Sequence, residues 1–515
     1  MPFHAIIRSA SVVDGTGETP QFTADVGVAG DRITAIGDLS SATADHDIDG
    51  SGLTLAPGFV DVHVHSEISL LGGRDQLSTL HQGVTTHLLA PDGFGWAPLP
   101  PQLAREFWAY AKFAYGDLEL SFDWPTAESY LDLFPGNTPA NVYPQVPHCA
   151  VRLNAMGWDA RPATDDEIAR MEDLTREWMD AGAGCLCLGL DYQPSAHADT
   201  RELVALCKVA ASYGGIYAAH QRFQLLGHDP AWRETIELSR LAGIPVHVSH
   251  SSVNDQTIPF LEECESEEID LTIESYLYPA GMTHVVMMLP MDVQAGNNDT
   301  VLERMRDPEI RARSLPHLKD KLGPEGNQIV GHTRSGRYCG MTLAKAASDA
   351  GKSWEDFAYD LVLEEDGVEA FVFPWQVPKE EIEPTMQRTA AHPRVMVASD
   401  GVYDVPHPHP RSRGCFSRFL RRYMRELGVI SLEEAVYKMS GFPAQRFGLR
   451  DRGQIGVGKA ADLVLLDADT IADRSTFEAP LQESVGVQAV MVNGSWVILE
   501  GKATGALPGR VLQRS

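Results

Sequence analysis

The chain has 515 residues, 43% of them hydrophobic and 22% charged, a composition typical of a large folded protein rather than a disordered one. Its formal net charge of −29 argues against nucleic acid or an anionic membrane surface as a partner. No apolar stretch has the length of a transmembrane helix, and the first residues lack the features of a signal peptide. Seven scattered cysteines favour a reducing compartment, so we expect a cytoplasmic protein without a membrane partner.

Both ends of the chain predict short β-strands. Residues 3–56 divide into apolar, alternating runs separated by Gly and Asp. Near the C-terminus the same texture returns in GKAADLVLLDAD and in VQAVMVNGSWVILEG, where VNG signals a hairpin. We therefore expect residues 1–56 and 450–515 to form one small β domain built from both termini.

The middle of the chain, residues 57–449, alternates helices and strands. Helical periodicity covers residues 164–182, 200–215 and 229–243, and each of these is followed by a short apolar run, namely CLCLGLDY, IYAAH and IPVHVSH. This order predicts an α/β fold with a parallel sheet or barrel. Residues 283–340 follow neither period and are rich in Met, Pro, Arg and Gly, which predicts a lid or binding insertion.

The segment GFVDVHVHSE, residues 58–67, carries the first sign of chemistry. His63 and His65 lie two apart in an apolar, β-branched run, so on a strand both imidazoles point to one side, as two ligands of one metal must. A pair of this kind alone is a weak signal, because histidines at strand ends are often only polar surface.

Further polar residues follow the later strands. His220 ends IYAAH, His250 ends IPVHVSH and Asp400 ends VMVASD. In a β/α barrel the carboxyl ends of the strands build the active site, so these residues are expected to converge with the histidine pair. Histidine and aspartate are ligands of hydrolytic zinc sites, which makes a metal centre the preferred interpretation.

The order HxH, His, His and SDG resembles the amidohydrolase superfamily, and more narrowly its N-acyl-D-amino-acid deacylase (D-aminoacylase) family. Segments similar to that family run through nearly the whole chain and include APGFVDVHVHSE, GGIYAAHQR, LYPAGMTHVVMMLP, HPRSRGCF and LEEAVYKMSGFPAQRFGLRDRGQIGVGKAADLVLLDADTIAD. The resemblance implies a (β/α)8-type, TIM-like barrel over residues 57–449, with a β-sandwich from both termini.

Three departures from the family pattern affect the site. The family usually has GNCG after its second strand, with a zinc-ligating Cys, whereas this chain has APDGFG and places Asp92 there. Asp92 is a candidate zinc ligand or bridge, and because carboxylate is harder than thiolate it would shift the preference toward other divalent ions or favour a second metal. The alternative is that Asp92 only starts a turn, since Asp-Gly is a strong turn pair. Ser252 replaces a Lys that the family tends to carry, and HQRFQLLG keeps only Arg222 of an Arg/Glu-rich stretch.

The resemblance also implies a mechanism. His220, His250 and Asp92 would hold the main metal, with zinc expected as one or two ions. His63 and His65 would complete a second position or hydrogen-bond the attacked oxygen, and Asp400 would be the general acid/base.

The expected substrate is a small amide that carries a carboxylate, which calls for an arginine. We expect substrate contacts from polar residues whose positions in the sequence suggest that they lie near the site: Tyr192, Arg222, Ser252, Tyr278, Arg334 and Arg411. An apolar acyl pocket is a further hypothesis, with barrel core as the alternative, for four residues: Met287, Met288, Phe373 and Trp375.

The preferred function is hydrolysis of the amide bond of N-acyl amino acids, a non-peptide C–N bond, by a metal-activated water. One alternative keeps the superfamily but changes the bond to a dipeptide, a cyclic amide or an amide-linked toxin or xenobiotic. Another is a non-catalytic scaffold that kept the fold. Chirality, acyl preference, metal identity and self-association into a homo-oligomer stay open at this point.

Overall fold

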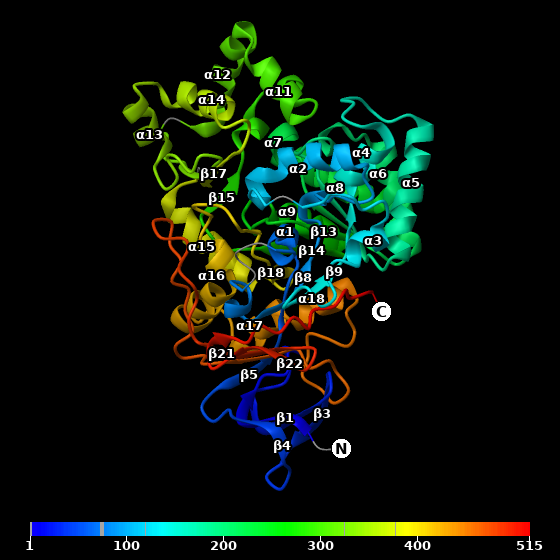
Figure 1. The fold of residues 1–515 in the computed structure, drawn as a ribbon, viewed down its shortest axis with the longest axis vertical. Helices are drawn as coiled ribbons and strands as arrows, with labels where there is room; N and C mark the ends of the chain where they lie inside the picture. The colour runs from blue at the N-terminus through cyan, green and yellow to red at the C-terminus, as the bar shows by residue number, and fades with distance from the viewer. Residues whose placement is uncertain (1–2, 73–76, 119, 324, 376, 515) are drawn as a thin grey trace.

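The computed structural model describes residues 3–72, 77–118, 120–323, 325–375 and 377–514. Strands from both ends of the chain lie together at one end of the molecule, and α/β elements fill the rest (Figure 1). Among the described residues, no helix has both the length and the apolar character needed to cross a membrane.

The terminal strands form one nine-stranded sheet in the order β23-β22-β21-β20-β5-β1-β2-β3, with β4 paired to β1. The N-terminal and C-terminal halves meet where β5 runs antiparallel to β20, with Thr54 opposite Leu466 and Pro57 opposite Leu463. All four residues of β20 are buried, as expected for a strand with neighbours on both sides. The bounds are β1 Phe3–Val12, β2 Phe22–Ala29, β3 Arg32–Gly37, β4 Ala44–Asp49, β5 Thr54–Pro57, β20 Leu463–Leu466, β21 Val487–Val492, β22 Ser495–Leu499 and β23 Lys502–Ala503.

Parallel strands occupy the middle of the molecule. A six-stranded sheet has the order β10-β11-β12-β13-β14-β18, and β6, β8 and β9 form a parallel three-stranded sheet. The predicted α/β class is therefore confirmed. The bounds are β6 Phe59–Asp61, β8 Val84–Leu88, β9 Asn141–Tyr143, β10 Val146–Pro147, β11 Cys185–Gly189, β12 Ile216–His220, β13 Val246–Val248, β14 Leu271–Ser275 and β18 Val395–Val397.

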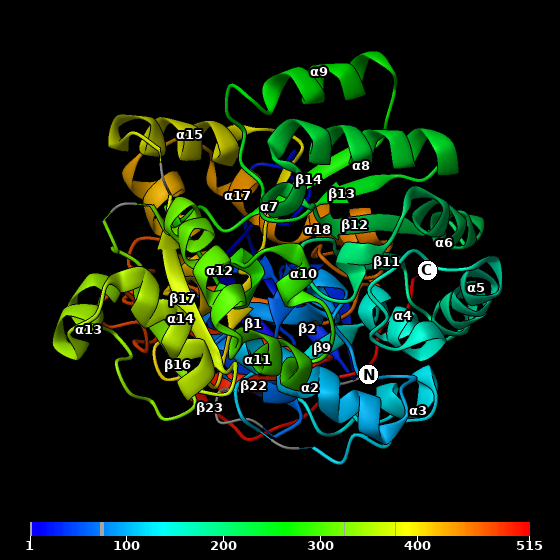
Figure 2. The same cartoon turned by 90° about the horizontal axis from the view of Figure 1, so that it is seen from above.

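The helices between these strands confirm the predicted periodicity. Helix α5, Asp165–Asp180, begins with a capping box in which Thr164 and Glu167 satisfy each other's backbone N–H groups. It buries an apolar face that includes Ile168, Met171 and Trp178. Helices α6, α8 and α9 lie on the outer side of β12, β13 and β14 (Figure 2), which leaves the strand ends free to carry polar groups.

The helices of the described chain have the following bounds: α1 Glu67–Leu70, α2 Pro101–Tyr115, α3 Ala127–Leu131, α4 His148–Met156, α6 Thr200–Ser212, α7 Phe223–Leu226, α8 His228–Ala242, α9 Ile258–Ser266, α10 Met291–Gln294, α11 Asn298–Met305, α12 Pro308–Leu322, α13 Leu343–Ala350, α14 Trp354–Glu364, α15 Lys379–Ala391, α16 Arg411–Arg418, α17 Leu432–Met439 and α18 Gly441–Phe447.

Residues 283–340 are more regular than their sequence predicts. They hold the 3-10 turn η4, Val285–Met288, and helices α10, α11 and α12, followed by strand β16, Ile329–Thr333. Helix α12 contains Pro316, which hides helical periodicity, and begins at Pro308 after the cap Asp307. Strand β16 joins β15, Ala280–Thr283, and β17, Glu369–Pro374, in a small antiparallel sheet beside the parallel strands.

The strand expected through the His63–His65 pair is interrupted. Strand β6 ends at Asp61, and only Val64–His65 form the next strand, β7, which pairs in parallel with β19, Gly401–Val402. His250 also lies just past β13, with a φ of 35°. These polar residues lie at or just past the ends of the hydrogen-bonded strands, where their side chains turn toward a common point.

Candidate active site

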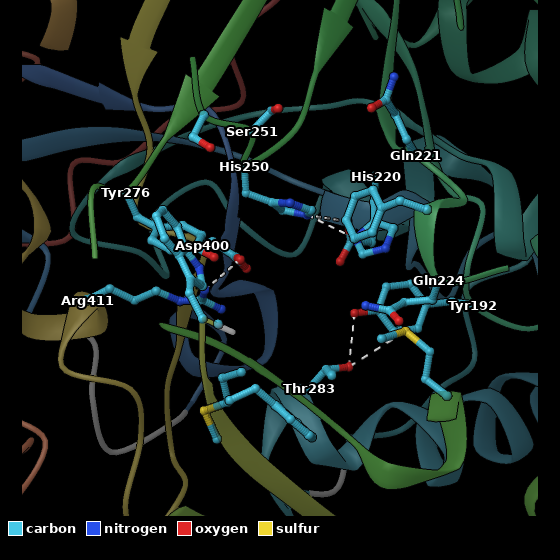
Figure 3. A pocket seen from close by; sticks show the side chains of 18 of the residues that line it. Tyr192, His220, Gln221, Gln224, His250, Ser251, Tyr276, Thr283, Asp400 and Arg411 are labelled. Carbon is cyan, nitrogen blue, oxygen red and sulfur yellow. Dashed lines mark hydrogen bonds and ion pairs between the residues drawn. The ribbon is translucent and has the colours of Figure 1, made fainter. Parts of the chain in front are cut away.

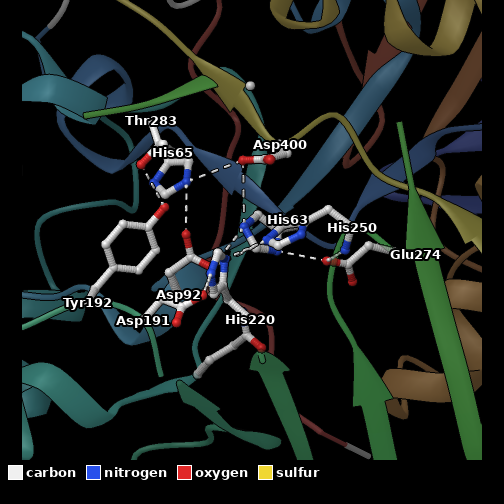
Figure 4. A network of polar contacts seen from close by, with 12 residues as sticks. His63, His65, Asp92, Asp191, Tyr192, His220, His250, Glu274, Thr283 and Asp400 are labelled. Carbon is white, nitrogen blue, oxygen red and sulfur yellow. Dashed lines mark hydrogen bonds and ion pairs between the residues drawn. The ribbon is translucent and has the colours of Figure 1, made fainter. Parts of the chain in front are cut away.

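Six predicted residues meet where the parallel strands end (Figure 4): His63, His65, Asp92, His220, His250 and Asp400. Their backbones leave regular structure, since Asp92, His250 and Asp400 have φ values of 55°, 35° and 46°. Non-glycine residues seldom adopt this left-handed region, and such strain concentrates at functional sites. The backbone N–H of Asp400 donates to the His63 carbonyl oxygen at 2.8 Å, so two of these segments are tied together.

Asp92 lies at the centre of the cluster. Its Oδ1 atom is 3.5 Å from His63 Nε2 and 3.8 Å from both His220 Nδ1 and His250 Nε2. Its other oxygen, Oδ2, lies 3.6 Å from His65 Nε2. The His220 and His250 nitrogens are only 2.9 Å apart. One carboxylate therefore faces all four histidines, with a different oxygen toward His65 than toward the others.

Asp400 closes the opposite side of the cluster. Its Oδ1 atom lies 3.4 Å from His65 Nε2 and 3.7 Å from His63 Nε2, and its Oδ2 atom lies 2.9 Å from Arg411 Nη1. Although burial opposes ionisation, the neighbouring Arg411 guanidinium and the histidines hold the pKa of Asp400 well below its usual range. The carboxylate is therefore ionised and can accept a proton.

Two buried carboxylates behind the histidines were not predicted. Glu274, on β14, accepts a hydrogen bond from His63 Nδ1 at 2.7 Å, and Asp191, just after β11, accepts one from His220 Nε2 at 3.1 Å. Burial opposes ionisation, but His247 and His63 lower the pKa of Glu274 to about 2. The only sequence signal is an acidic residue inside or directly after an apolar strand, in LTIES and in CLCLGLD.

The donor set fits a divalent metal ion. His63, Asp92 and His250 form one group, and His63, His65 and Asp400 a second, with ligand atoms within 4.8 Å of one another in each. His63 Nε2 and Asp92 Oδ1 are buried without a hydrogen-bond partner among the described residues, and both face the centre. Imidazole nitrogens and carboxylate oxygens suit zinc and similar ions, and carboxylates behind ligating histidines are typical of such centres.

A cavity of about 530 Å³ opens over this cluster (Figure 3). One wall is neutral and polar, with Gln224, Ser251 and Ser252 near His220 and His250. The other wall is apolar and comes from α2, η4 and the small antiparallel sheet, and it contains Phe113, Met282, Met287, Met288, Phe373 and Trp375. All four residues predicted for an apolar acyl pocket line this cavity.

The predicted substrate contacts divide into two groups. Tyr192, Ser252 and Arg411 line the cavity, and Tyr192 shares a hydrogen bond of 3.1 Å with Thr283, another lining residue. The other three predicted contacts are absent from its lining: Arg222, Tyr278 and Arg334.

Each of these three has partners elsewhere. Arg222 pairs with Glu234 at 2.8 Å and donates to two backbone carbonyls. Tyr278 packs against His409 and under the Arg418 guanidinium. Half-exposed Arg334 pairs with Asp366 at another surface.

Comparisons with known proteins agree with this geometry. Residues 372–498 match the family model described as Amidohydrolase family. The chain is 36% identical to a D-aminoacylase of Alcaligenes xylosoxydans xylosoxydans over 100% of this chain and 98% of that protein.

Two solved structures extend the likeness to the whole fold. A D-aminoacylase studied for its binuclear metal centre gives a TM-score of 0.82 at 33% identity, with 100% of both chains covered. The N-acyl-D-glutamate deacylase of Bordetella bronchiseptica, complexed with zinc and a phosphonate that mimics the tetrahedral intermediate, gives 0.83 at 30% identity, again with both chains fully covered. The chain therefore belongs to the N-acyl-D-amino-acid deacylase (D-aminoacylase) family of amidohydrolases.

Proposed function

We propose that this protein is a metal-dependent hydrolase of the amide bond in N-acyl amino acids, with N-acyl-D-amino acids as the first substrates to test. The observation that carries the proposal is the cluster of four histidines, Asp92 and Asp400, all of which except His63 line a cavity that also contains a buried arginine. The non-catalytic alternative has little support, because a scaffold has no need of a complete donor set with aligned carboxylates behind it.

For the fold, we propose that β6, β8, β9, β11, β12, β13, β14 and β18 close into an eight-stranded (β/α)8-type barrel. Support comes from the parallel pairing of β7 with β19 and from the hydrogen bond of Ser399 N to Asp61 Oδ1 at 2.9 Å, which link the last strand to the first. Residues 57–449 would form the barrel domain, with 283–340 as a lid. Residues 1–56 and 450–515 would form the β-sandwich domain.

For the metal centre, we propose two neighbouring positions. His220, His250 and Asp92 Oδ1 would hold one ion, and His63, His65 and Asp400 the other, with Asp92 Oδ2 facing the second position. When bound, zinc or another divalent ion supplies Lewis-acid chemistry that lowers the pKa of water and polarises the scissile carbonyl. Asp92 Oδ1 and Oδ2 point to different histidines, which suits a bridging carboxylate.

Asp400 is proposed as the general base and then the general acid. Oδ2 is held by Arg411, whereas Oδ1 faces the histidines and the cavity, so one oxygen is available to take a proton from the attacking water. The same oxygen then gives the proton to the leaving amine nitrogen, which completes C–N cleavage. Proton transfer by a positioned side chain contributes roughly 10²–10⁴ in rate.

Arg411 is proposed as the receptor for the substrate carboxylate. It is buried, its guanidinium lies 4.4 Å from the centroid of the Tyr276 ring, and it lines the cavity. Its nitrogens have no well-aligned hydrogen-bond partner among the described residues, although Nη1 is within ion-pair distance of Asp400. A buried guanidinium with unused N–H groups calls for an anion, and a carboxylate accepts two parallel hydrogen bonds.

The cavity also suggests which substrates to compare. Seven free cysteines, six of them buried, support a reducing compartment, so cytoplasmic N-acyl amino acids are suitable candidates. The apolar wall of Met287, Met288 and Phe373 favours an uncharged side chain or acyl group. A screen would therefore compare N-acetyl-D-methionine and N-acetyl-D-leucine with their L-enantiomers, with N-acetyl-D-glutamate and with dipeptides.

The test of the mechanism is Asp400→Asn. We expect turnover to fall by at least about 10²-fold, because asparagine cannot accept the proton, while elemental analysis still finds the zinc ion assigned to His220, His250 and Asp92. Treatment with a chelator should abolish wild-type activity, and added zinc should restore it. An Asp400→Asn variant with unchanged kcat would refute the assigned role, and a wild-type enzyme that ignores metal removal would refute the proposed function.

A further inference from the structure

We propose that Glu274 is a positioning residue that orients histidines of both metal positions at once. Glu274 lies on β14, is 1% exposed and does not line the cavity, so it does not touch the substrate. Its Oε1 atom accepts hydrogen bonds from His63 Nδ1 at 2.7 Å and from the backbone N–H of His250 at 3.2 Å (Figure 4). His63 belongs to both candidate donor groups and His250 to one of them, and the metal centre proposed above assigns the two histidines to different ions.

The hydrogen bond between His63 Nδ1 and Glu274 Oε1 selects the tautomer of His63. A neutral imidazole carries its proton on one nitrogen only, and the partner of one nitrogen decides which atom keeps a lone pair. Because a carboxylate accepts but does not donate, His63 must place its proton on Nδ1. The lone pair is then on Nε2, which faces Asp92 at 3.5 Å and Asp400 at 3.7 Å.

The second contact holds the backbone of His250. This residue lies past the end of β13 with a φ of 35°, outside the strand ladder that would otherwise fix it. The hydrogen bond from its N–H to Glu274 Oε1 keeps the ring turned so that Nε2 lies 2.9 Å from His220 Nδ1. One oxygen atom therefore ties together segments that are 187 positions apart in the chain, on the numbering of His63 and His250.

The other oxygen anchors Glu274 itself. Oε2 contacts His247 Nε2, and His247 Nδ1 hydrogen-bonds the Thr272 hydroxyl at 2.7 Å. Asp191 offers a contrast, because it contacts a single site histidine, His220, and otherwise accepts backbone N–H groups at the start of α7. Of these two carboxylates, only Glu274 contacts histidines of both proposed metal positions.

The experiment compares Glu274→Gln with Glu369→Gln. Glu369 is also buried, at 0% exposure, and accepts a backbone N–H from Val285 at 3.1 Å, but among the described residues it forms no hydrogen bond or ion pair with a site histidine. Zinc affinity of the apoproteins is measured by chelator competition, and the cobalt(II)-loaded proteins are examined by visible absorption. The inference rests on the proposed metal centre, so wild-type protein that binds neither ion would instead overturn the proposed function.

We expect Glu274→Gln to weaken zinc binding by 10- to 100-fold, the usual loss when a partner of a metal-ligating histidine is removed, and to change the cobalt spectrum. Glu369→Gln should match the wild type in both. A Glu274→Gln protein with wild-type affinity and spectrum would overturn the inference. If that variant does not fold, His247→Gln decides instead, since it loosens the Oε2 anchor. It should weaken zinc binding in the same direction, and an unchanged affinity would overturn the inference.

Discussion

Arg411 contacts Asp400 and is also the proposed receptor for the substrate carboxylate. Its guanidinium is close enough to Asp400 to hold that carboxylate ionised, yet Arg411 also lines the cavity and its nitrogens have no well-aligned hydrogen-bond partner among the described residues. Arg418 is the last residue of α16, as Arg411 is the first. Its guanidinium also lies over a tyrosine ring, that of Tyr278, but outside the cavity. The two arginines therefore form a natural pair for comparison.

We expect Arg411→Lys to reduce kcat/KM for N-acetyl-D-methionine by roughly 10- to 100-fold, because a hydrogen-bonded charge contributes about 1.5–3 kcal/mol and lysine cannot bind a carboxylate through two parallel bonds. The matching substrate with a C-terminal carboxamide should lose much less. Steady-state kinetics with both substrates give this ratio, and Arg418→Lys should leave it unchanged. Equal losses on the two substrates would show that Arg411 does not read the carboxylate.

For single residues, the sequence predicts the candidate metal ligands better than it predicts the residues that hydrogen-bond to them. His220, His250 and Asp400 could be found because each ends an apolar run, and strand ends meet in parallel sheets. Arg334, a candidate by its position in the insertion, lies at another surface with Asp366, because a place in an insertion does not fix the direction of a side chain. Glu274 was missed because its importance depends on contacts with residues 211 and 24 positions away.

The apolar wall of the cavity depends on a buried carboxyl group. The wall contains residues of the β15-β17-β16 sheet and of η4, and Glu369 of β17 accepts the N–H of Val285 at the start of η4. Burial raises the pKa of Glu369 from 4.5 to about 8. Periodicity could not predict this arrangement, because helix α12 contains proline and the paired strands of the sheet are antiparallel.

Glu369→Gln should therefore change how stability depends on pH. Because its pKa is raised in the folded state, Glu369 makes a contribution to the free energy of unfolding that is fully present below pH 4.5. This contribution falls by about 1.4 kcal/mol per pH unit as the pH rises, until it is lost at about pH 8. Glutamine keeps the acceptor but cannot ionise. Urea unfolding of both apoproteins at pH 5 and pH 8 should show the variant gaining stability relative to wild type at pH 8. A difference that is constant with pH would contradict the assignment.

Across the whole molecule, the two chain ends are joined to the parallel strands by a buried polar junction. Asp462, just before β20, accepts from Asn141 Nδ2 of β9 at 3.0 Å and from the backbone N–H of Asn493 at 2.6 Å, and it pairs with Arg452. The alternating runs at both termini predict the shared sheet itself. They could not predict this junction, which joins polar residues from segments distant in sequence.

Removing the Asp462 carboxylate should be much more costly than removing a carboxylate from a surface pair. Asp462→Ala removes the buried ionic partner of the 7%-exposed Arg452, and breaking a buried pair costs roughly 3–5 kcal/mol. Asp255 pairs with Arg388 at 2.6 Å with side chains 91% and 41% exposed, so Asp255→Ala should cost about 1 kcal/mol or less. Free energies of unfolding in urea, followed by circular dichroism, distinguish the two. Equal losses would mean that the junction does not stabilise the contact between the terminal sheet and the parallel strands.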